Sequence, residues 1–154
     1  MLLRDGELRI GIASTRFEET RHFAIREAVF IHELGYAGPE RDDVDIRAVK
    51  LIAKLAGQVV GTARVHREHG SVFFGGRLAV IERCRQEGLG VGRRLLAGVD
   101  RVVQERHGTS IVGYGRAEVA GFFKSCGYTT GSPINYRGVR HVEIQRIFKL
   151  GSAV

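Results

Sequence analysis

The chain has 154 residues, of which 44% are hydrophobic, and 24 basic against 17 acidic residues give it a formal net charge of +7. This length predicts a single domain over residues 1–154 with one compact core. The apolar runs fall far short of the ~18 residues of a membrane span, and residues 1–7 lack the apolar region of a signal peptide. We therefore expect a cytoplasmic protein without a membrane partner.

Arginine dominates the basic residues, since only four of them are lysine. The planar guanidinium suits phosphate and carboxylate groups, which favours an anionic ligand. The arginines are spread along the chain without a basic run or interleaved aromatic residues, so a small phosphorylated ligand is favoured over nucleic acid. Cys84 and Cys126 have neither CxxC nor scaffold spacing, and we expect reduced thiols.

Hydrophobic periodicity and turn residues predict strands and helices without a linker or an internal repeat. The expected strands are 7–13, 48–55, 59–65, 71–81, 110–114 and 141–150. The expected helices are 18–34, one that follows the glycine-rich segment near residue 90 and ends at Gly108, and 117–125. We expect a loop over 35–45, which contains four acidic residues, and a polar turn over 66–70. The strands from 48 to 81 are expected to form a β-meander.

Three glycines, Gly88, Gly90 and Gly92, occupy alternate positions where a strand gives way to a helix. Glycine destabilises a helix by roughly 0.5–1 kcal/mol relative to alanine, so this placement needs a reason. Backbone N–H groups at a helix N-terminus have no intrahelical partner, and glycines would let a phosphate contact them directly. The spacing fits neither GxGxxG nor GxxxxGK[ST], which leaves Arg85-x-x-Gly88-x-Gly90, with a plain glycine-rich turn as the alternative.

In these residues the chain resembles the GNAT superfamily of acyl-CoA-dependent N-acetyltransferases. The matching segments are 77–80, which leads into 85–96, and 121–128, which is similar to the family pattern A-x-x-F-Y-x-x-x-G-F. The resemblance covers nearly the whole chain and implies a mixed α+β fold, with a central, mostly antiparallel, splayed β-sheet flanked by helices on both faces. Further segments, 26–33, 42–45, 60–65 and 138–141, are similar to a narrower set, the nitrogen-starvation-associated acetyltransferases.

The resemblance implies an enzyme that takes an acetyl or other short acyl group from CoA and transfers it directly to a primary amine of a small molecule, without a metal. It also implies that the strand backbone at 78–80 pairs with pantetheine, while the glycine loop and helix start hold the pyrophosphate. The residues assigned to CoA are Leu78, Ala79, Val80, Arg85, Gln86, Glu87, Gly88, Leu89, Gly90, Val91, Gly92, Arg93 and Phe123.

The chain departs from the family pattern at a catalytic position. Phe123 stands where the family often has a tyrosine that protonates the departing thiolate. Tyr114 is an alternative acid, and the thiolate could also leave as an anion or take a proton from water. Glu33 is a candidate base or amine-binding residue, because the C-terminal end of a helix disfavours a bare carboxylate; a solvated side chain is the alternative. His141 has the same two candidate roles, against a purely structural histidine.

Two other polar groups have alternative interpretations. Arg77 could bind a carboxylate of the acceptor, or pair with Glu82 or with an acid of the 40–45 segment. His66, Glu68 and His69 have a spacing that a metal could use, although a solvated hairpin tip is favoured and no metal is expected.

Two other functions stay open. An acyl-homoserine lactone synthase has the same fold and uses S-adenosylmethionine, but that family is longer, lacks this glycine loop and has N-terminal tryptophans, which this chain does not contain. A non-catalytic acyl-CoA sensor or a nucleic-acid-binding module is favoured by Phe123 and by the +7 charge. The oligomeric state is also open, and pairing of an exposed edge strand between two copies would give a homodimer.

Overall fold

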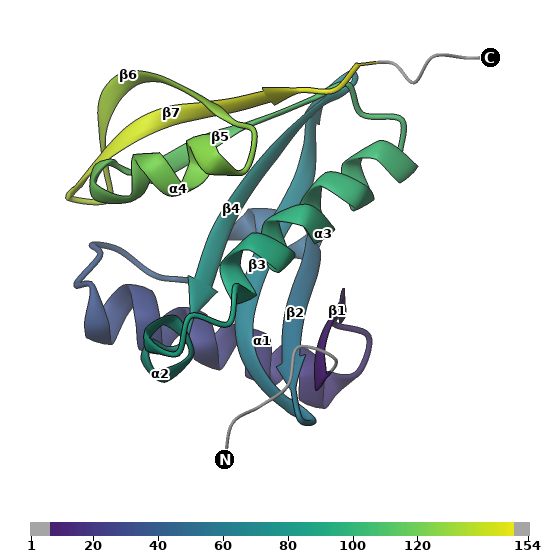
Figure 1. Cartoon of the computed structure of the whole chain (residues 1–154), viewed down its shortest axis with the longest axis vertical. Coiled ribbons are helices and arrows are strands. Elements are labelled where there is room, and N and C mark those ends of the chain that lie inside the picture. Colours follow the sequence, from purple (N-terminus) through teal and green to yellow (C-terminus); the bar gives the residue numbers. More distant parts are fainter. Residues whose placement is uncertain (1–6, 150–154) are drawn as a thin grey trace.

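A seven-stranded sheet forms the centre of the computed structural model, which describes residues 7–149 (Figure 1). The strand order is β1-β2-β3-β4-β5-β7-β6, and every neighbouring pair is antiparallel except β4 and β5. The strands are β1 (Leu8–Ile12), β2 (Val49–Leu55), β3 (Gln58–His69), β4 (Val72–Val80), β5 (Ser110–Arg116), β6 (Thr129–Tyr136) and β7 (Val139–Ile147). The expected mixed α+β class with a mostly antiparallel sheet is confirmed.

Helices cover both faces of the sheet (Figure 1). They are α1 (Arg16–Arg26), the π-helix η2 (Glu27–Glu33), the 3-10 helix η3 (Asp43–Ile46), α2 (Glu82–Gln86), α3 (Val91–Glu105), the 3-10 turn η4 (Ala117–Val119) and α4 (Ala120–Ser125). On one face α3 buries Leu95, Val99 and Val103 in the larger apolar core, which α4 joins through Phe123. On the other face α1 and η2 bury Ile25 and a second, smaller apolar cluster. Among the described residues, no helix is long and apolar enough to cross a bilayer.

The first helix changes its winding before it ends. Thr15 and Glu18 form a capping box at its N-terminus, which satisfies two otherwise unpaired amides. From Glu27 onward the turns widen, and the Leu34 amide donates to the Val29 carbonyl oxygen at 2.9 Å. The predicted helix over 18–34 is therefore present, but its last two turns form a π-helix, a geometry that is frequent at functional sites.

The sheet divides between β4 and β5. The two strands pair only from Val72 and Ser110 to Gly75 and Gly113, and then diverge toward the left of Figure 1. At the point of divergence a Cβ on Gly113 would lie 2.5 Å from the Gly75 carbonyl oxygen, so only glycine fits. The splay leaves the backbone of residues 76–80 without a partner strand on the β5 side, within the described chain.

A bulge reshapes β4 at the same level. Its register against β3 shifts between Thr62 and Arg64, and Arg77 takes a positive φ of 54°. Bulges of this kind bend a strand and redirect a side chain. Here the bulge turns β4 away from β5 and sends the Arg77 side chain toward the 40–45 segment.

Three elements were not predicted. The strand β6 and the helix α2 lie in segments for which no element was predicted, and the helix η3 begins within the loop expected over 35–45. The polar turn expected over 66–70 is largely strand, since β3 continues to His69. The last strand begins and ends earlier than expected, at Val139 and Ile147, and residue 150 of the predicted range lies outside the described residues.

Candidate active site

The splay between β4 and β5 opens into a cleft of about 730 Å³. Its walls come from η2, β4, the segment after α2, the start of α3, β5, α4 and the β6–β7 hairpin. Most of the predicted site residues line it: Glu33, Arg77, Leu78, Ala79, Val80, Arg85, Gly88, Leu89, Gly90, Val91, Gly92, Arg93, Tyr114, Phe123 and His141. Gln86 and Glu87 do not, because they are exposed at the end of α2.

The glycine segment over residues 88–92, referred to below as the cradle segment, has an open backbone at the start of α3. Gly88 and Gly90 have φ values of +64° and +69°, and a Cβ on either would point into open space. Gly90 caps α3 without a side-chain hydrogen bond, and the first carbonyl bond of the helix runs from the Arg94 amide to Gly90 at 3.1 Å. The amides of residues 91–93 precede that bond and are therefore left for a ligand, at the positive end of the helix dipole.

A second set of backbone groups faces the cleft from β4. The Ile81 amide donates to the Val60 carbonyl oxygen at 3.0 Å, so it points toward β3. Neighbouring residues of a strand direct their polar groups to opposite sides, which turns the N–H and carbonyl of Val80 toward the cleft. The Arg85 guanidinium, which also lines the cleft, donates to that carbonyl, in agreement with this orientation.

No protein-family model matches the chain. A Bacillus subtilis protein named "putative acetyltransferase" is 31% identical over 125 residues, which cover 78% of this chain and 83% of that protein. The crystal structure of a "putative N-acetyltransferase" from Lactobacillus plantarum superposes with a TM-score of 0.82 at 23% identity, over 92% of this chain and 99% of that one. The chain belongs to the GNAT acetyltransferase family.

A further structural neighbour has a ligand. The "putative streptothricin acetyltransferase" of Bacillus anthracis, in complex with acetyl coenzyme A, superposes with a TM-score of 0.57 at 19% identity, over 67% of this chain and 64% of that one. Such a likeness shows the shared fold. The narrower placement among nitrogen-starvation-associated acetyltransferases stays a prediction.

In this GNAT acetyltransferase the Glu33 carboxylate is held by a charged partner. Glu33 is the last residue of η2, and it forms an ion pair with Arg85, which also lines the cleft. The Glu33 side chain is 30% exposed and that of Arg85 is 38% exposed, so the pair is partly solvated. The ion pair joins the end of the first helix to Arg85, which precedes the cradle segment. It engages the carboxylate of Glu33, which was predicted as a candidate base.

His141 forms a buried pair with a tyrosine that was not predicted. The His141 Nδ1–H donates to the Val139 carbonyl oxygen at 2.8 Å, and the Tyr36 hydroxyl lies 3.0 Å from Nε2. Since a carbonyl only accepts, Nδ1 carries the proton in the neutral ring and Nε2 accepts from Tyr36. Burial lowers the pKa of His141, with a contribution from the charge of Arg116, and burial raises the pKa of Tyr36 to about 12.

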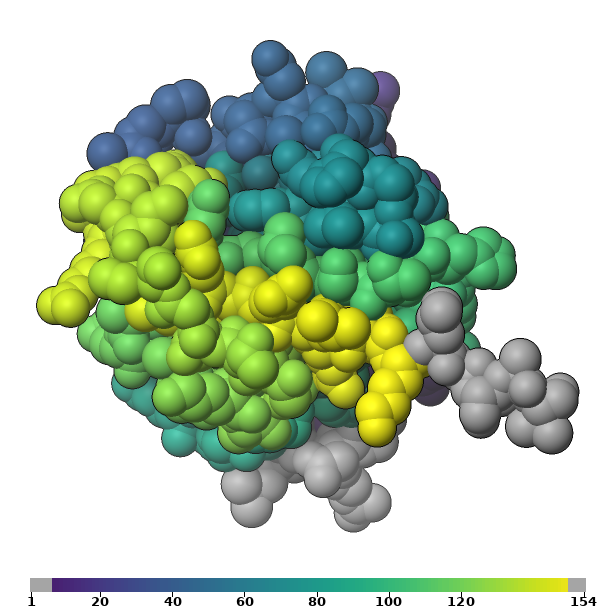
Figure 2. Space-filling view, turned by 90° about the horizontal axis from the view of Figure 1, so that it is seen from above, coloured from purple at the N-terminus to yellow at the C-terminus, as the bar shows by residue number. Residues whose placement is uncertain are grey.

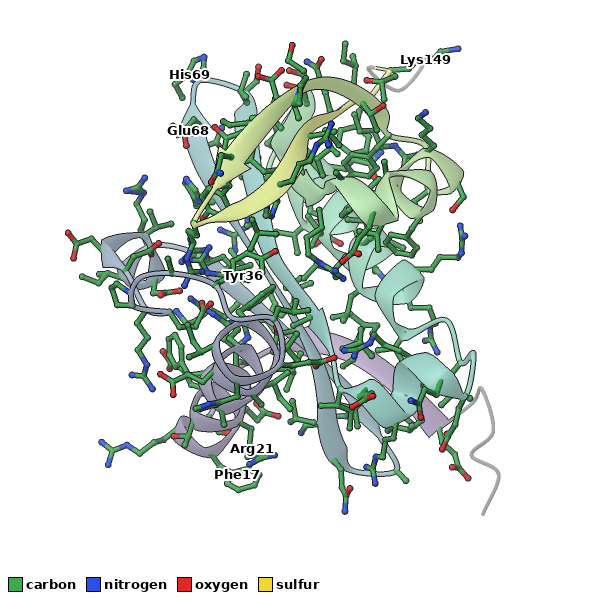
Figure 3. All side chains as sticks on the ribbon, turned by 90° about the vertical axis from the view of Figure 1, so that its left-hand side faces the viewer. Phe17, Arg21, Tyr36, Glu68, His69 and Lys149 are labelled. Carbon is green, nitrogen blue, oxygen red and sulfur yellow. The ribbon has the colours of Figure 1, made fainter. Side chains whose placement is uncertain are left out.

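Tyr36 lines the cleft. Figure 3 places it between the first helix and the β6–β7 hairpin, and its ring meets Phe30 and His141 edge to face. Tyr114, the other tyrosine of interest, lies in the same wall, where its ring packs on Phe74 and Tyr136. Sequence alone offered no signal for Tyr36, because it lies in a glycine-containing loop and meets its partner more than 100 residues later.

A network of charged side chains lies behind this wall and anchors the 37–47 segment. Its members are the arginines Arg26, Arg64, Arg77 and Arg137 and the carboxylates Glu40, Asp42 and Asp45. Glu40 has a fully buried side chain and receives three arginines, with N–O distances of 2.7 to 3.1 Å. Burial alone would raise the pKa of Asp45, but hydrogen bonds from Arg26 and Arg64 hold it well below its ordinary value.

Arg137 closes the network from the β6–β7 turn. Its Nε donates to the Ala37 carbonyl oxygen at 2.9 Å, and its guanidinium lies over the Tyr36 ring. Figure 2 shows the blue segment near residue 40 and the yellow-green turn near residue 137 side by side at this end of the molecule. The loop expected over 35–45 is therefore a fixed wall of the site, which its acidic composition did not reveal.

Arg77 takes the second of the alternatives that the sequence left open. Its guanidinium bonds Glu40 at 2.7 Å, Asp42 at 3.2 Å and the Tyr136 hydroxyl at 2.8 Å. Burial opposes the charged form, but Glu40 and the other partners raise the pKa of Arg77. Glu82 is not its partner, and the guanidinium is occupied by protein groups, although it lines the cleft.

His66, Glu68 and His69 do not line the cleft, whereas Cys84 does. Figure 3 shows Glu68 and His69 at the outer tip of the β3–β4 hairpin, and His66 bonds Glu68 at 2.9 Å. In residues 7–149 no group of three or more histidine, cysteine or acidic side chains is placed to hold a metal. Cys84 and Cys126 are free thiols, and burial raises the pKa of Cys84, which makes it a poor nucleophile.

A buried histidine in contact with the network should make the stability of the acetyltransferase depend on pH. His22 is fully buried between the Leu51 carbonyl oxygen and Arg26, and burial lowers its pKa to about 4. In the unfolded chain its pKa is about 6.5, so between these values only the unfolded state takes up the proton. The free energy of unfolding should fall by about 3 kcal/mol from pH 6.5 to pH 4, and this contribution is complete at lower pH.

Urea unfolding at pH 7, 5.5 and 4 measures this slope. His22→Gln keeps a donor and an acceptor but cannot titrate, so its stability should depend less on pH in this window. His69→Gln, on the exposed hairpin tip, should keep the wild-type slope. Equal slopes for wild type and His22→Gln would show that another group is responsible.

Proposed function

We propose that this acetyltransferase transfers an acetyl group from acetyl-CoA directly to a primary amine of a small molecule. The observation that carries the proposal is the combination of a splayed β4, whose residues 76–80 have no partner strand on the β5 side in the described chain, and an α3 N-terminus capped by glycine, both in one cleft. Backbone amides of this kind fit the pyrophosphate and the pantetheine chain of CoA. The family and the acetyl-CoA complex of a structural neighbour support the same donor.

The cleft residues divide the work of holding CoA. The amides of residues 91–93 would bind the pyrophosphate, where Gly88 and Gly90 leave the space open. The Arg93 guanidinium is directed to the Ser125 hydroxyl at 2.8 Å, so its amide is the contributing group. Phe123 packs so closely against Gly115 that a Cβ on residue 115 would lie 2.5 Å from the Phe123 ring. The Phe123 ring forms part of the apolar wall of the cleft.

When bound, acetyl-CoA supplies the thioester. The Val80 N–H is placed to donate to the acyl oxygen as negative charge develops there, which stabilises the transition state. The amine nitrogen forms a bond to the acyl carbon, the carbon–sulfur bond breaks, and the proton of the amine must go to a base. Because the cleft holds both reactants side by side, much of the rate enhancement comes from positioning.

We assign the base to the Tyr36–His141 pair. The Tyr36 oxygen can accept the amine proton while its own proton passes to His141 Nε2, which the Val139 carbonyl keeps unprotonated. Glu33 has its carboxylate in the ion pair with Arg85, so we assign it to positioning the cradle. Tyr114 stays the candidate acid for the thiolate, since Phe123 has no proton to donate.

Tyr36→Phe should lower kcat by roughly a hundredfold, the usual contribution of a positioned base, and leave the KM for acetyl-CoA unchanged. Glu33→Gln should instead raise the KM for acetyl-CoA and change kcat little. The measurement is steady-state thiol release over pH 5.5–9, with melting temperatures as the control for folding. If Glu33→Gln lost kcat while Tyr36→Phe kept it, the two roles would be reversed.

Calorimetric titration with CoA, dephospho-CoA and pantetheine tests the donor assignment. The proposal expects micromolar-range binding of CoA and of dephospho-CoA, which both carry the pyrophosphate, and loss of most of the affinity for pantetheine. Equal binding of pantetheine and CoA would remove the cradle from the proposal.

A further inference from the structure

The cleft has an unbalanced set of charges. The charged side chains that line it are the arginines Arg64, Arg77, Arg85, Arg93, Arg116 and Arg137 and a single carboxylate, Glu33. Two of these arginines, Arg85 and Arg93, lie at the cradle end, beside the helix start that would hold the pyrophosphate. Arg137 lies over the Tyr36 ring, Arg77 bonds Tyr136, which packs on His141, and Arg116 stands opposite His141 in the strand register. Arg64 belongs to the network behind this end.

The nearby carboxylates do not neutralise this end. The network behind the wall contains four arginines but only three carboxylates, so it has one surplus positive charge. His22, which contacts it, is neutral because its pKa is lowered to about 4. Arg116 pairs with Glu118, whose side chain is 72% exposed at the rim, so solvent weakens that pair.

Arg116 is the arginine best placed to meet an acceptor. It ends β5 and stands opposite His141 of β7 in the strand register. Directly opposed residues of neighbouring strands direct their side chains to the same face, so Arg116 lies beside His141 in the cleft wall, and its charge disfavours the protonated form of His141. Unlike Arg77 and Arg137, whose donors are directed to several groups of the network, Arg116 has one carboxylate partner and lies 24% exposed at the cleft.

From this arrangement we infer that the acceptor is a primary amine that carries a carboxylate close to the amine, as an amino acid does, and that Arg116 binds the carboxylate. The inference rests on the proposed function and names the acceptor class of the same site. A guanidinium binds a carboxylate with two parallel hydrogen bonds, which fixes the position of the attached amine. An amine without an anionic group would be repelled by the same arginines.

The positive surroundings have a second consequence for such an acceptor. Nearby like charges disfavour an ammonium group, so the bound acceptor loses its proton more readily than in water. The neutral amine is the nucleophile that acyl transfer requires. The arginines would therefore bind the acceptor by its carboxylate and activate it at its nitrogen.

The test compares two matched pools of acceptors with acetyl-CoA: L-amino acids and the corresponding amino acid amides, which differ only in the carboxylate. Mass spectrometry of the N-acetyl products should show at least tenfold faster acetylation of the acids. Arg116→Gln should lower kcat/KM for the acids at least tenfold and leave CoA affinity unchanged. Arg101→Gln is the matched control, because Arg101 is 81% exposed and pairs with Glu105 on α3, away from the residues that line the cleft.

Equal or faster acetylation of the amides would overturn the inference, and so would an equal loss for both pools in Arg116→Gln. If neither pool reacts while a polyamine such as spermidine is acetylated, the acceptor class is wrong and the proposed function stands. If CoA is not bound and no amine is acetylated, the proposed function itself fails, and the acceptor inference fails with it.

Discussion

Gly90→Val should weaken the binding of acetyl-CoA by ten- to a hundredfold. At Gly90 the backbone has a φ of +69° and the space in front of it is open toward the cleft, so a valine side chain would fill the volume in which a phosphate meets the amides of α3. Loss of one or more charge-assisted hydrogen bonds costs about 1–3 kcal/mol of binding free energy. This loss raises the dissociation constant by roughly ten- to a hundredfold. Calorimetric titration measures it.

The matched control is Gly70→Val in the β3–β4 turn. Gly70 has a φ of +55° and open space around it, so valine there meets a similar left-handed strain of roughly 1–2 kcal/mol but lies away from the cleft. Both variants should lose stability, and only Gly90→Val should lose CoA. Gly98 on α3 is unsuitable as a control, because a Cβ there would lie 2.8 Å from the Ile10 side chain. Normal CoA binding by Gly90→Val would place the pyrophosphate elsewhere.

Arg26→Met should lower the free energy of unfolding by about 3–5 kcal/mol, the usual effect of breaking a buried ion pair on one side. Arg26 has no exposed surface and bonds Glu40 at 2.9 Å and Asp45 at 2.6 Å, so its removal leaves two buried carboxylates short of a partner. For a chain of this length the melting temperature should fall by roughly 10 °C. Urea unfolding and thermal melts measure the two quantities.

The control for Arg26→Met is Arg101→Met. Arg101 forms an exposed pair with Glu105 one turn along α3, and such pairs contribute only about 0.3–0.5 kcal/mol. A double substitution, Arg26→Met with Glu40→Gln, should be less destabilising than the sum of the single changes, because it removes both charges of one pair. A loss below about 1 kcal/mol for Arg26→Met would mean that the network does not hold the 37–47 segment.

Much of the fold follows from local signals in the sequence. The meander from 48 to 81 alternates or runs apolar between turn residues, and α3 repeats Leu95, Val99 and Val103 at helical spacing. The position of the glycine segment at the start of α3 was also predicted, whereas its role in holding an anion stays a prediction. These features depend on residues that are close in the sequence, so hydrophobic periodicity and turn residues predict them.

The strand β6 was missed for the opposite reason. It is an edge strand, mostly exposed, and it contains Gly131 and Pro133, which weaken any strand pattern. Only its pairing with β7, broken by a register shift between Thr130 and Pro133, makes it a strand. A pattern that arises from a partner cannot be read from the segment itself.

The charge network and the Tyr36–His141 pair were beyond sequence reasoning for a related reason. Arg26 meets Asp45 across 19 positions, but Arg137 meets Glu40 across 97, and nothing in the local pattern couples them. The same holds for Glu33, whose pairing with Arg85 could not be seen from the helix end alone. The sequence identified candidate residues. Their hydrogen-bond and ion-pair partners, which decide their roles, lie far away in the sequence and are seen only in the folded chain.

Hydrogen exchange followed by mass spectrometry, with and without saturating acetyl-CoA, locates the backbone amides that the cofactor protects. If the splay between β4 and β5 and the N-terminus of α3 hold the cofactor, acetyl-CoA should slow exchange in peptides that cover residues 78–80 and 88–93. Peptides from β1 at the far edge of the sheet should not change. Unchanged exchange over residues 78–93, with protection confined to another part of the chain, would contradict the account.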